Sequence, residues 1–387
     1  MRRVFHKVNN SLVVAFLFIL TYLSKAFTDA IYVSNEISSP LINIKYIFAI
    51  LLIFYSLLVF IKSERKIYKG QKMLFSVLFV SFSFLVISLT KIIITGHPSM
   101  AVFEYLFKIL IGIFVAFCVI NLVEDDALFV SFVFILIGSI IAYLFEIGIE
   151  NITLENIKKI NFFNSYSPFE SHLFASISVI LCIYFCYFRK NIFLSIISLI
   201  FALATFKRLS VVFSLLFFVA TTFFRKNKRI SNKWSCFFAL LFIILTCIYY
   251  YFLLPENQSK FESIFNIDSM TQFTMGRNLY FIQLFNSNYI NFGIGSIQNA
   301  VGISLEMDLI EMLIESTPIG LAIFCFIYWK IPENKIYSTL FFFFLFLNML
   351  MSHSLSNGLN WAVYFIVLFL LNISDSVEKR ERKVHLK

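Results

Sequence analysis

The sequence predicts an all-α protein that crosses a membrane many times. Of its 387 residues, 60% are hydrophobic and only 14% are charged, and the mean hydropathy is +0.86. Apolar runs repeatedly reach the roughly 17–25 residues that an α-helix needs to cross the hydrocarbon. The alternating pattern of membrane β-barrel strands is absent. This composition excludes a soluble domain and favours a polytopic α-helical membrane protein.

We expect a single integral membrane domain over residues 1–387 with about twelve transmembrane helices. The basic start before Leu12 resembles a signal peptide, but no convincing cleavage site follows, so we interpret this segment as a retained first span. The expected spans are 11–28, 41–61, 73–95, 101–122, 127–148, 169–188, 191–206, 210–224, 234–254, 308–329, 337–352 and 359–374.

The positive charges predict the orientation of the chain. Most of the 32 Lys and Arg residues fall in alternate loops, which is typical of cytoplasmic loops. This pattern places both termini in the cytoplasm and predicts an inner-membrane protein. Two substantial loops then lie outside, 149–168 and the long loop 255–307. Within the second, Gly276–Phe285 is partly amphipathic and suits the membrane interface.

The net charge of +10 does not indicate nucleic-acid binding, because its basic clusters flank apolar spans and suit anionic lipid. We therefore expect membrane lipid as a partner and no nucleic acid. The six cysteines lie within or beside apolar spans without paired metal-ligand spacing. They are interpreted as packing residues.

Lys207 and Arg208 depart from the charge pattern, because they lie in a short loop that the same count places outside. Positive charges at the outer edge of a membrane are costly, so cations that break the preference for cytoplasmic loops indicate a functional site. A guanidinium can grip a phosphate with two hydrogen bonds, and an ammonium adds a point charge. The alternative is that both side chains reach up to lipid headgroups.

Two glycine motifs lie in the long outer loop. Gly276 precedes Arg277, the only arginine of that loop, and the pair suits close approach to a phosphate. Gly293 and Gly295 form a Gly-x-Gly turn whose backbone N–H groups can face an anion. The alternatives are a solvated arginine and an ordinary turn.

Acidic residues follow the long loop, at and after the start of the tenth span. The spacing places three of them, Asp308, Glu311 and Glu315, on one helical face. Glu306 lies just before the start of this helix. Helix capping accounts equally well for Glu306 and Asp308. Glu315 lies about two turns into the apolar span, where capping does not explain it.

Three further sets of polar residues stand at span edges. Glu170 and His172 open the sixth span and suit acid–base or sugar-binding roles, although a lone interfacial histidine is commonly structural. Glu104/Lys108 and Lys25/Asp29 are opposite charges four residues apart, which we interpret as structural pairs.

Together these motifs, over roughly residues 165–325, resemble the superfamily of O-antigen polymerases and O-antigen ligases. Arg208, Arg277, Glu315 and Gly320 match the ligase-like pattern in order and spacing. In the ligase-like pattern a histidine lies nine residues before a glutamate, and a Gly-x-x-Gly follows that glutamate. Glu306 stands here in place of the histidine, and Thr317 replaces the first of the two glycines. These departures favour the polymerase branch.

The resemblance implies a GT-C-like membrane glycosyltransferase with a periplasmic active site. Its substrates would be undecaprenyl-pyrophosphate-linked oligosaccharides, joined without a metal or other cofactor. Arg208 and Arg277 would hold the pyrophosphate with help from Lys207. Glu306, or secondly Asp308, would act as the base, and Glu315 would position an arginine. A chain-length regulator is a further candidate partner.

Three alternatives stay open at this point: an O-antigen ligase, a flippase for lipid-linked oligosaccharide, and a membrane scaffold. A scaffold leaves Lys207 and Arg208 unexplained. A flippase rarely needs a long outer loop whose motifs gather on one side.

Overall fold

A computed structural model describes residues 2–62, 68–158, 169–189, 191–223 and 228–384. In these residues the chain is helical, and its only strand-like pairing is an isolated bridge between Arg229 and Lys335. The predicted all-α class is thus confirmed, together with the presence of apolar helices long enough to cross a membrane. The number of crossings and the GT-C-like arrangement stay predictions.

Among the described residues, six helices have the length and hydropathy to span a membrane, and six shorter apolar helices have 10–17 residues. Each predicted span overlaps one of these twelve segments. The long ones are Asn9–Val33, Pro40–Ile61, Gln71–Thr95, Ala101–Leu122, Asp125–Ile147 and Lys233–Leu253. The shorter ones are His172–Phe188, Ile192–Ala204, Arg208–Phe223, Thr317–Tyr328, Ile336–Met351 and Gly358–Ile373.

The chain forms two compact units. The first comprises Met1–Gly70, Phe114–Lys226 and Ala362–Leu370, and the second comprises Gln71–Ile113, Asn227–Trp361 and Leu371–Lys387. Two helices, α4 (Ala101–Leu122) and α18 (Gly358–Val384), contribute to both units.

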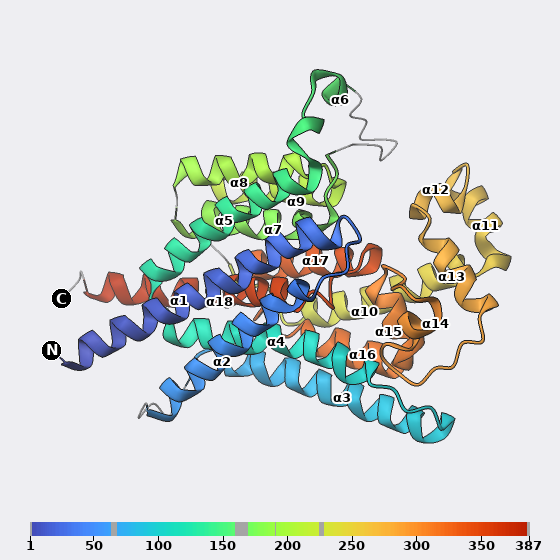
Figure 1. Ribbon diagram of the computed structural model, residues 1–387, viewed down its shortest axis with the longest axis horizontal. Coiled ribbons are helices and arrows are strands. Elements are labelled where there is room, and N and C mark those ends of the chain that lie inside the picture. The colour runs from blue at the N-terminus through green and yellow to red at the C-terminus, as the bar shows by residue number, and fades with distance from the viewer. Residues whose placement is uncertain (1, 63–67, 159–168, 190, 224–227, 385–387) are drawn as a thin grey trace. The chain divides into compact units, whose positions relative to one another are not determined.

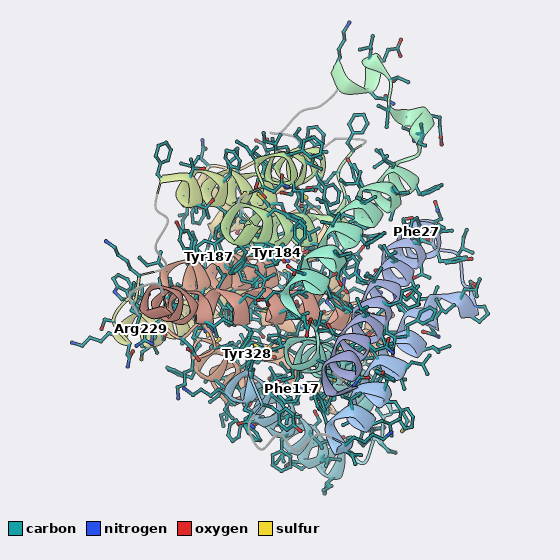
Figure 2. All side chains as sticks on the ribbon, turned by 90° about the vertical axis from the view of Figure 1, so that its left-hand side faces the viewer. Phe27, Phe117, Tyr184, Tyr187, Arg229 and Tyr328 are labelled. Carbon is teal, nitrogen blue, oxygen red and sulfur yellow. The ribbon has the colours of Figure 1, made fainter. Side chains whose placement is uncertain are left out.

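The first unit is built from apolar helices that pack along their lengths, with α1 against α2 and α5, and α7 against α8 and α9. Aromatic rings fill the contacts. Tyr184, which is labelled in Figure 2, lies at the end of α7. It stacks on Phe132 of α5 with ring centroids 4.0 Å apart. The helices are α1 (Arg2–Thr28), α2 (Ile44–Lys62), α5 (Asp125–Ile147), α6 (Leu154–Lys158), α7 (His172–Tyr184), α8 (Ile192–Ala204) and α9 (Arg208–Phe223).

In the second unit, α16 packs against α3 and α10, and α17 packs against α15. A close backbone contact joins α4 to the start of α18, where a Cβ on Gly358 would lie 1.7 Å from the carbonyl oxygen of Lys108. Only glycine fits there. The longer helices are α3 (Gln71–Thr95), α10 (Lys233–Leu253), α16 (Thr317–Tyr328) and α17 (Ile336–Met351).

The predicted long loop 255–307 is more ordered than expected. It contains α11 (Pro255–Phe265), α12 (Met270–Thr274), α13 (Arg277–Asn286) and α14 (Ser296–Val301), gathered beside the end of α10 (Figure 1). Their apolar faces share a small core with α15 that includes Leu253, Phe261, Phe281 and Ile310. Only the helix near Gly276–Phe285 was expected from the sequence.

The predicted tenth span 308–329 is not one continuous helix. It divides into α15 (Asp308–Glu315) and α16, and Thr317, the first residue of α16, has a φ of +68°. Thr317 precedes Pro318, and contact with the proline ring disfavours the ordinary helical conformation for the residue before a proline. The break separates the acidic residues of α15 from the apolar helix that follows.

Candidate functional site

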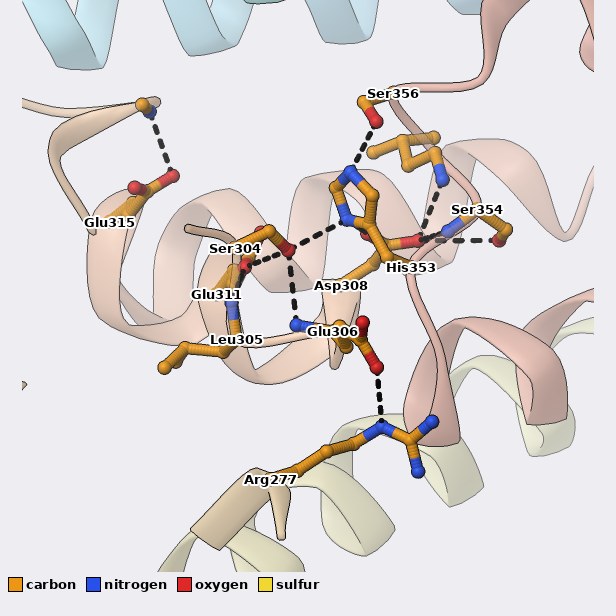
Figure 3. A network of polar contacts seen from close by, with 12 residues as sticks. Arg277, Ser304, Leu305, Glu306, Asp308, Glu311, Glu315, His353, Ser354 and Ser356 are labelled. Carbon is orange, nitrogen blue, oxygen red and sulfur yellow. Dashed lines mark hydrogen bonds and ion pairs between the residues drawn. The ribbon is translucent and has the colours of Figure 1, made fainter. Parts of the chain in front are cut away.

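The acidic helix α15 lies at the centre of the candidate site. Asp308, Glu311 and Glu315 are all buried, at 0%, 4% and 3% exposure. Buried carboxylates need partners because an uncompensated charge in the interior is costly. Each of the three finds a different set of partners, drawn from segments before and after α15 (Figure 3).

Asp308 holds the segment 352–357 that joins α17 to α18. Its Oδ2 accepts hydrogen bonds from the backbone N–H groups of Ser354 and Leu355, both at 2.7 Å, and from the Ser354 hydroxyl at 3.2 Å. Its Oδ1 lies 2.8 Å from Nδ1 of His353. Because Asp308 is fully buried and so engaged, Glu306 is the better placed of the two candidate bases.

Glu311 holds the end of the long loop, and Ser304 of that loop contacts the segment 352–357. The Ser304 hydroxyl donates to Oε1 of Glu311 at 2.7 Å, and the Leu305 N–H donates to the same oxygen at 2.5 Å. Oγ of Ser304 also lies 2.9 Å from Nδ1 of His353. One ligand atom from each of Asp308, Glu311 and His353 lies within 4.8 Å of the others, a spacing that suits a metal ion.

His353 is partly exposed, with 29% of its side chain accessible. Burial alone would lower the pKa of this imidazole, but the negative charge of Asp308 outweighs burial and raises the pKa to about 9. In the absence of another cation, His353 is therefore the positive charge that neutralises part of this cluster.

Glu315 secures the predicted Gly-x-Gly turn. Its two carboxylate oxygens accept from the N–H groups of Gly295 at 3.0 Å and Ile297 at 2.8 Å. The N–H groups of the turn face an anion, but that anion is a side chain of the protein itself, and a role of Gly293 and Gly295 in substrate binding stays a prediction. Glu315 was expected to position an arginine, and its contacts here are with backbone N–H groups instead.

Gly293 must be glycine for the turn to pack against α3. Its φ is +106°, and a Cβ at this position would lie 2.6 Å from Cα of Ser88. The Ser88 hydroxyl in turn accepts from the N–H of Ile294 at 3.1 Å. Lys91, one turn further along α3, donates to the backbone oxygen of Glu315 at 2.7 Å.

Glu306 and Arg277 form the exposed part of this site. Nε of Arg277 donates to Oε2 of Glu306 at 3.1 Å, and the side chains are 12% and 50% exposed, respectively (Figure 3). Gly276 caps α13 at a φ of +84°, which starts the helix at Arg277. Glu306 itself has a φ of +56°, a conformation that non-glycine residues seldom adopt.

The remaining predicted residues lie in the first unit. His172 begins α7, and its Nδ1 lies 3.3 Å from Nζ of Lys207. Arg208 begins α9 and is exposed, while Glu170 is half-buried. Since Arg208 and Arg277 belong to different units, their joint action on one pyrophosphate stays a prediction.

Both predicted charge pairs four residues apart are confirmed. Lys108 lies 2.7 Å from Glu104, and Lys25 lies 2.8 Å from Asp29. The second pair gains a third member that the sequence did not indicate: Nζ of Lys45 is 2.5 Å from the other oxygen of Asp29. These buried charges join α1 to the start of α2.

The contributions of His353, Ser304 and Lys91 to the second unit were also missed. Ser304 and His353 are 49 positions apart, and Lys91 and Glu315 are 224 apart. No short-range spacing could have indicated these contacts. The one available signal was the polar sequence of 352–357 between two apolar runs.

This arrangement offers a partly exposed carboxylate held by a guanidinium, above a set of buried acids that fix the surrounding backbone. It suits proton abstraction beside an anionic group. Comparison with known proteins gives no assignment: no protein-family model matches the chain, and no match was found among curated proteins or solved structures.

Proposed function

We propose that the protein is a membrane glycosyltransferase that joins lipid-pyrophosphate-linked oligosaccharides, as an O-antigen polymerase does. The observation that carries the proposal is the contact between Glu306 and Arg277. It pairs a half-exposed carboxylate with a guanidinium on two segments that the sequence assigns to the same side of the membrane. The order of the Arg208, Gly276-Arg277, Gly293-x-Gly295 and Glu315 motifs supports it.

In this reaction Glu306 acts as the general base. A hydroxyl of the acceptor sugar gives its proton to a carboxylate oxygen of Glu306 as the hydroxyl oxygen attacks the anomeric carbon of the donor. The bond from that carbon to the pyrophosphate oxygen breaks, and the pyrophosphate leaves with the electron pair. The product is a longer oligosaccharide on the acceptor lipid.

Arginine stabilises the charge that develops on the leaving group. Nε of Arg277 binds Glu306 and Nη1 donates to the backbone oxygen of Thr274 at 3.2 Å, so Nη2 and the second N–H of Nη1 are the donors proposed for a phosphate. The forked geometry favours two hydrogen bonds to one phosphate. Protonation of Glu306 during the reaction removes a competing negative charge and strengthens the hold of Arg277 on pyrophosphate. Arg208 is the second arginine proposed for this group.

Several groups would position the substrate without taking part in proton transfer. Lys207 and His172, which lie together in the first unit, are proposed to contact the donor phosphate or sugar, with Glu170 beside them in sequence. We place the reaction on the periplasmic side of the inner membrane, with both termini in the cytoplasm.

The direct experiment uses the purified full-length protein and a lipid-linked repeat unit without a lipid A acceptor. A ladder of longer lipid-linked products that is lost in Arg277→Ala and Arg208→Ala, with unchanged thermal unfolding, is expected. Asp268→Asn, which removes an exposed carboxylate of the same loop, should leave the ladder unchanged.

The same preparation distinguishes the two alternative functions. Product that forms only when lipid A core is supplied would identify a ligase. Movement of the intact lipid-linked repeat across a vesicle bilayer, without any ladder, would identify a flippase and overturn the proposal.

A further inference from the structure

We infer that Asp308, Glu311 and His353 bind a divalent transition-metal cation. The three residues come from the start of α15 and from the segment 352–357, and each offers one ligand atom within 4.8 Å of the others (Figure 3). No metal was expected from the sequence. This inference goes beyond the proposed function and does not depend on it.

The state of Asp308 points to a ligand. Its Oδ2 has three hydrogen bonds, whereas its Oδ1 is completely buried and accepts none within the described residues. That oxygen lies 2.8 Å from Nδ1 of His353, its ion-pair partner, and accepts no hydrogen bond from it. A buried carboxylate oxygen left in this way is unusual, because burial removes its water. A cation between the two atoms would satisfy both.

The distances suit a metal ion. Ligand atoms that each lie about 2.0–2.2 Å from one ion are at most about 4.4 Å apart. The separations in the cluster are within 4.8 Å, so shifts of about a few tenths of an ångström close the coordination shell. Asp308 is already fixed by its hydrogen bonds, which leaves the partly exposed His353 to make most of this adjustment.

The surroundings of His353 resemble those of a ligating histidine. When Nδ1 binds a metal, Nε2 carries the proton and donates it to a nearby oxygen, which fixes the ring orientation. The Ser356 hydroxyl lies in hydrogen-bond contact with Nε2 of His353. Ser304, in contact with both Nδ1 of His353 and Oε1 of Glu311, borders the same position.

Charge favours a divalent ion. A metal ion at Nδ1 of His353 replaces the proton there, so two buried carboxylates and a neutral imidazole carry two negative charges, which one divalent cation balances. Arg277 does not supply that balance, since it binds Glu306. A set of two carboxylates and one imidazole favours Mn²⁺ or Zn²⁺, because Mg²⁺ and Ca²⁺ prefer oxygen ligands alone. The ion would join α15 to the segment 352–357, directly behind Glu306.

The test measures metal binding without any substrate. Full-length protein in detergent is stripped with a chelator and titrated with Mn²⁺, and the loss of the free Mn²⁺ electron paramagnetic resonance signal reports binding. We expect one saturable site that Zn²⁺ displaces. Ser356→Ala should weaken binding by about 10–100-fold, because it removes the partner of Nε2.

Two ligand variants make the assignment specific. His353→Gln and Asp308→Asn should abolish the saturable binding, and His353→Gln covers the case in which Asp308→Asn does not fold. Asp268→Asn, an exposed carboxylate outside the cluster, serves as the control and should bind as the wild type does.

Three results would overturn the inference. These are wild-type protein that retains no more Mn²⁺ than His353→Gln, full binding in both ligand variants, and displacement by Mg²⁺ but not by Zn²⁺. Since binding is read without turnover, failure of this test leaves the polymerase assay as a separate question.

Discussion

At the scale of single residues, burial separates carboxylates that the sequence could not tell apart. Glu306 and Asp308 are two positions apart and were both candidate bases. Asp308 is fully buried and fixed by the N–H groups of 354 and 355, whereas Glu306 is half-exposed beside Arg277. The sequence indicated that acids gather here, but their division of roles depends on contacts with residues far away in the chain.

Glu315 should be structural, because its two oxygens hold the backbone of the glycine turn. Glu315→Gln would direct an amide NH2 at one of the two N–H groups and leave it without an acceptor. We expect a loss of about 1–3 kcal/mol in the free energy of unfolding. Thermal unfolding in detergent measures this loss, with Asp268→Asn as the unaffected control. Equal stability of the two variants would contradict this role.

The Asp308–His353 pair should make the stability of metal-free protein depend on pH. The pKa of His353 is raised from 6.5 to about 9 in the folded protein, with Asp308, Glu311 and Glu306 as the charges that surround it. Stability from this pair is complete below pH 6.5 and is lost as the pH rises through about 9.

The unfolding temperature, measured with a chelator present, should therefore fall between these pH values. The fall should be smaller in His353→Gln. An identical pH profile for wild type and His353→Gln would show that His353 is not the responsible group.

At the scale of elements, the apolar helices were predictable and the polar connections were not. Runs of hydrophobic residues determine where membrane helices form, so all twelve expected ranges overlap apolar helices. The four short helices of 255–307 depend instead on a small shared core, with members as distant as Leu253 and Ile310. The break between α15 and α16 could have been expected from Pro318 alone.

The positive φ of Thr317 at this break can be tested by substitution, because the family that this sequence resembles has glycine at this position. A branched residue at positive φ costs about 1–2 kcal/mol, and glycine loses about 0.5–1 kcal/mol of that gain through its greater freedom when unfolded. We expect Thr317→Gly to raise stability by up to about 1 kcal/mol.

A matched substitution controls for the general effect of glycine. Thr90→Gly, at an exposed site in the ordinary helix α3, should lower stability by roughly 0.3–0.5 kcal/mol. Thermal unfolding of both variants checks the comparison. If Thr317→Gly is as destabilising as Thr90→Gly, the break is not strained at this residue.

At the scale of the whole molecule, the charge distribution predicts which surfaces face outward. Asp268 lies in the long loop that we expect in the periplasm, and Lys330 follows a span that we expect to end in the cytoplasm. In a background without native cysteines, a membrane-impermeant maleimide should label Asp268→Cys in intact spheroplasts. It should label Lys330→Cys only after permeabilisation, and the reverse pattern would contradict the proposed topology.

The central claim is that Glu306 is the base of a glycosyl transfer between lipid-linked oligosaccharides. Its most direct test is the turnover of purified Glu306→Gln at saturating lipid-linked substrate, because general base catalysis contributes about 100- to 10,000-fold. We predict a fall in kcat of at least about 100-fold with little change in substrate binding. Chain extension by Glu306→Gln at the wild-type rate would contradict the claim.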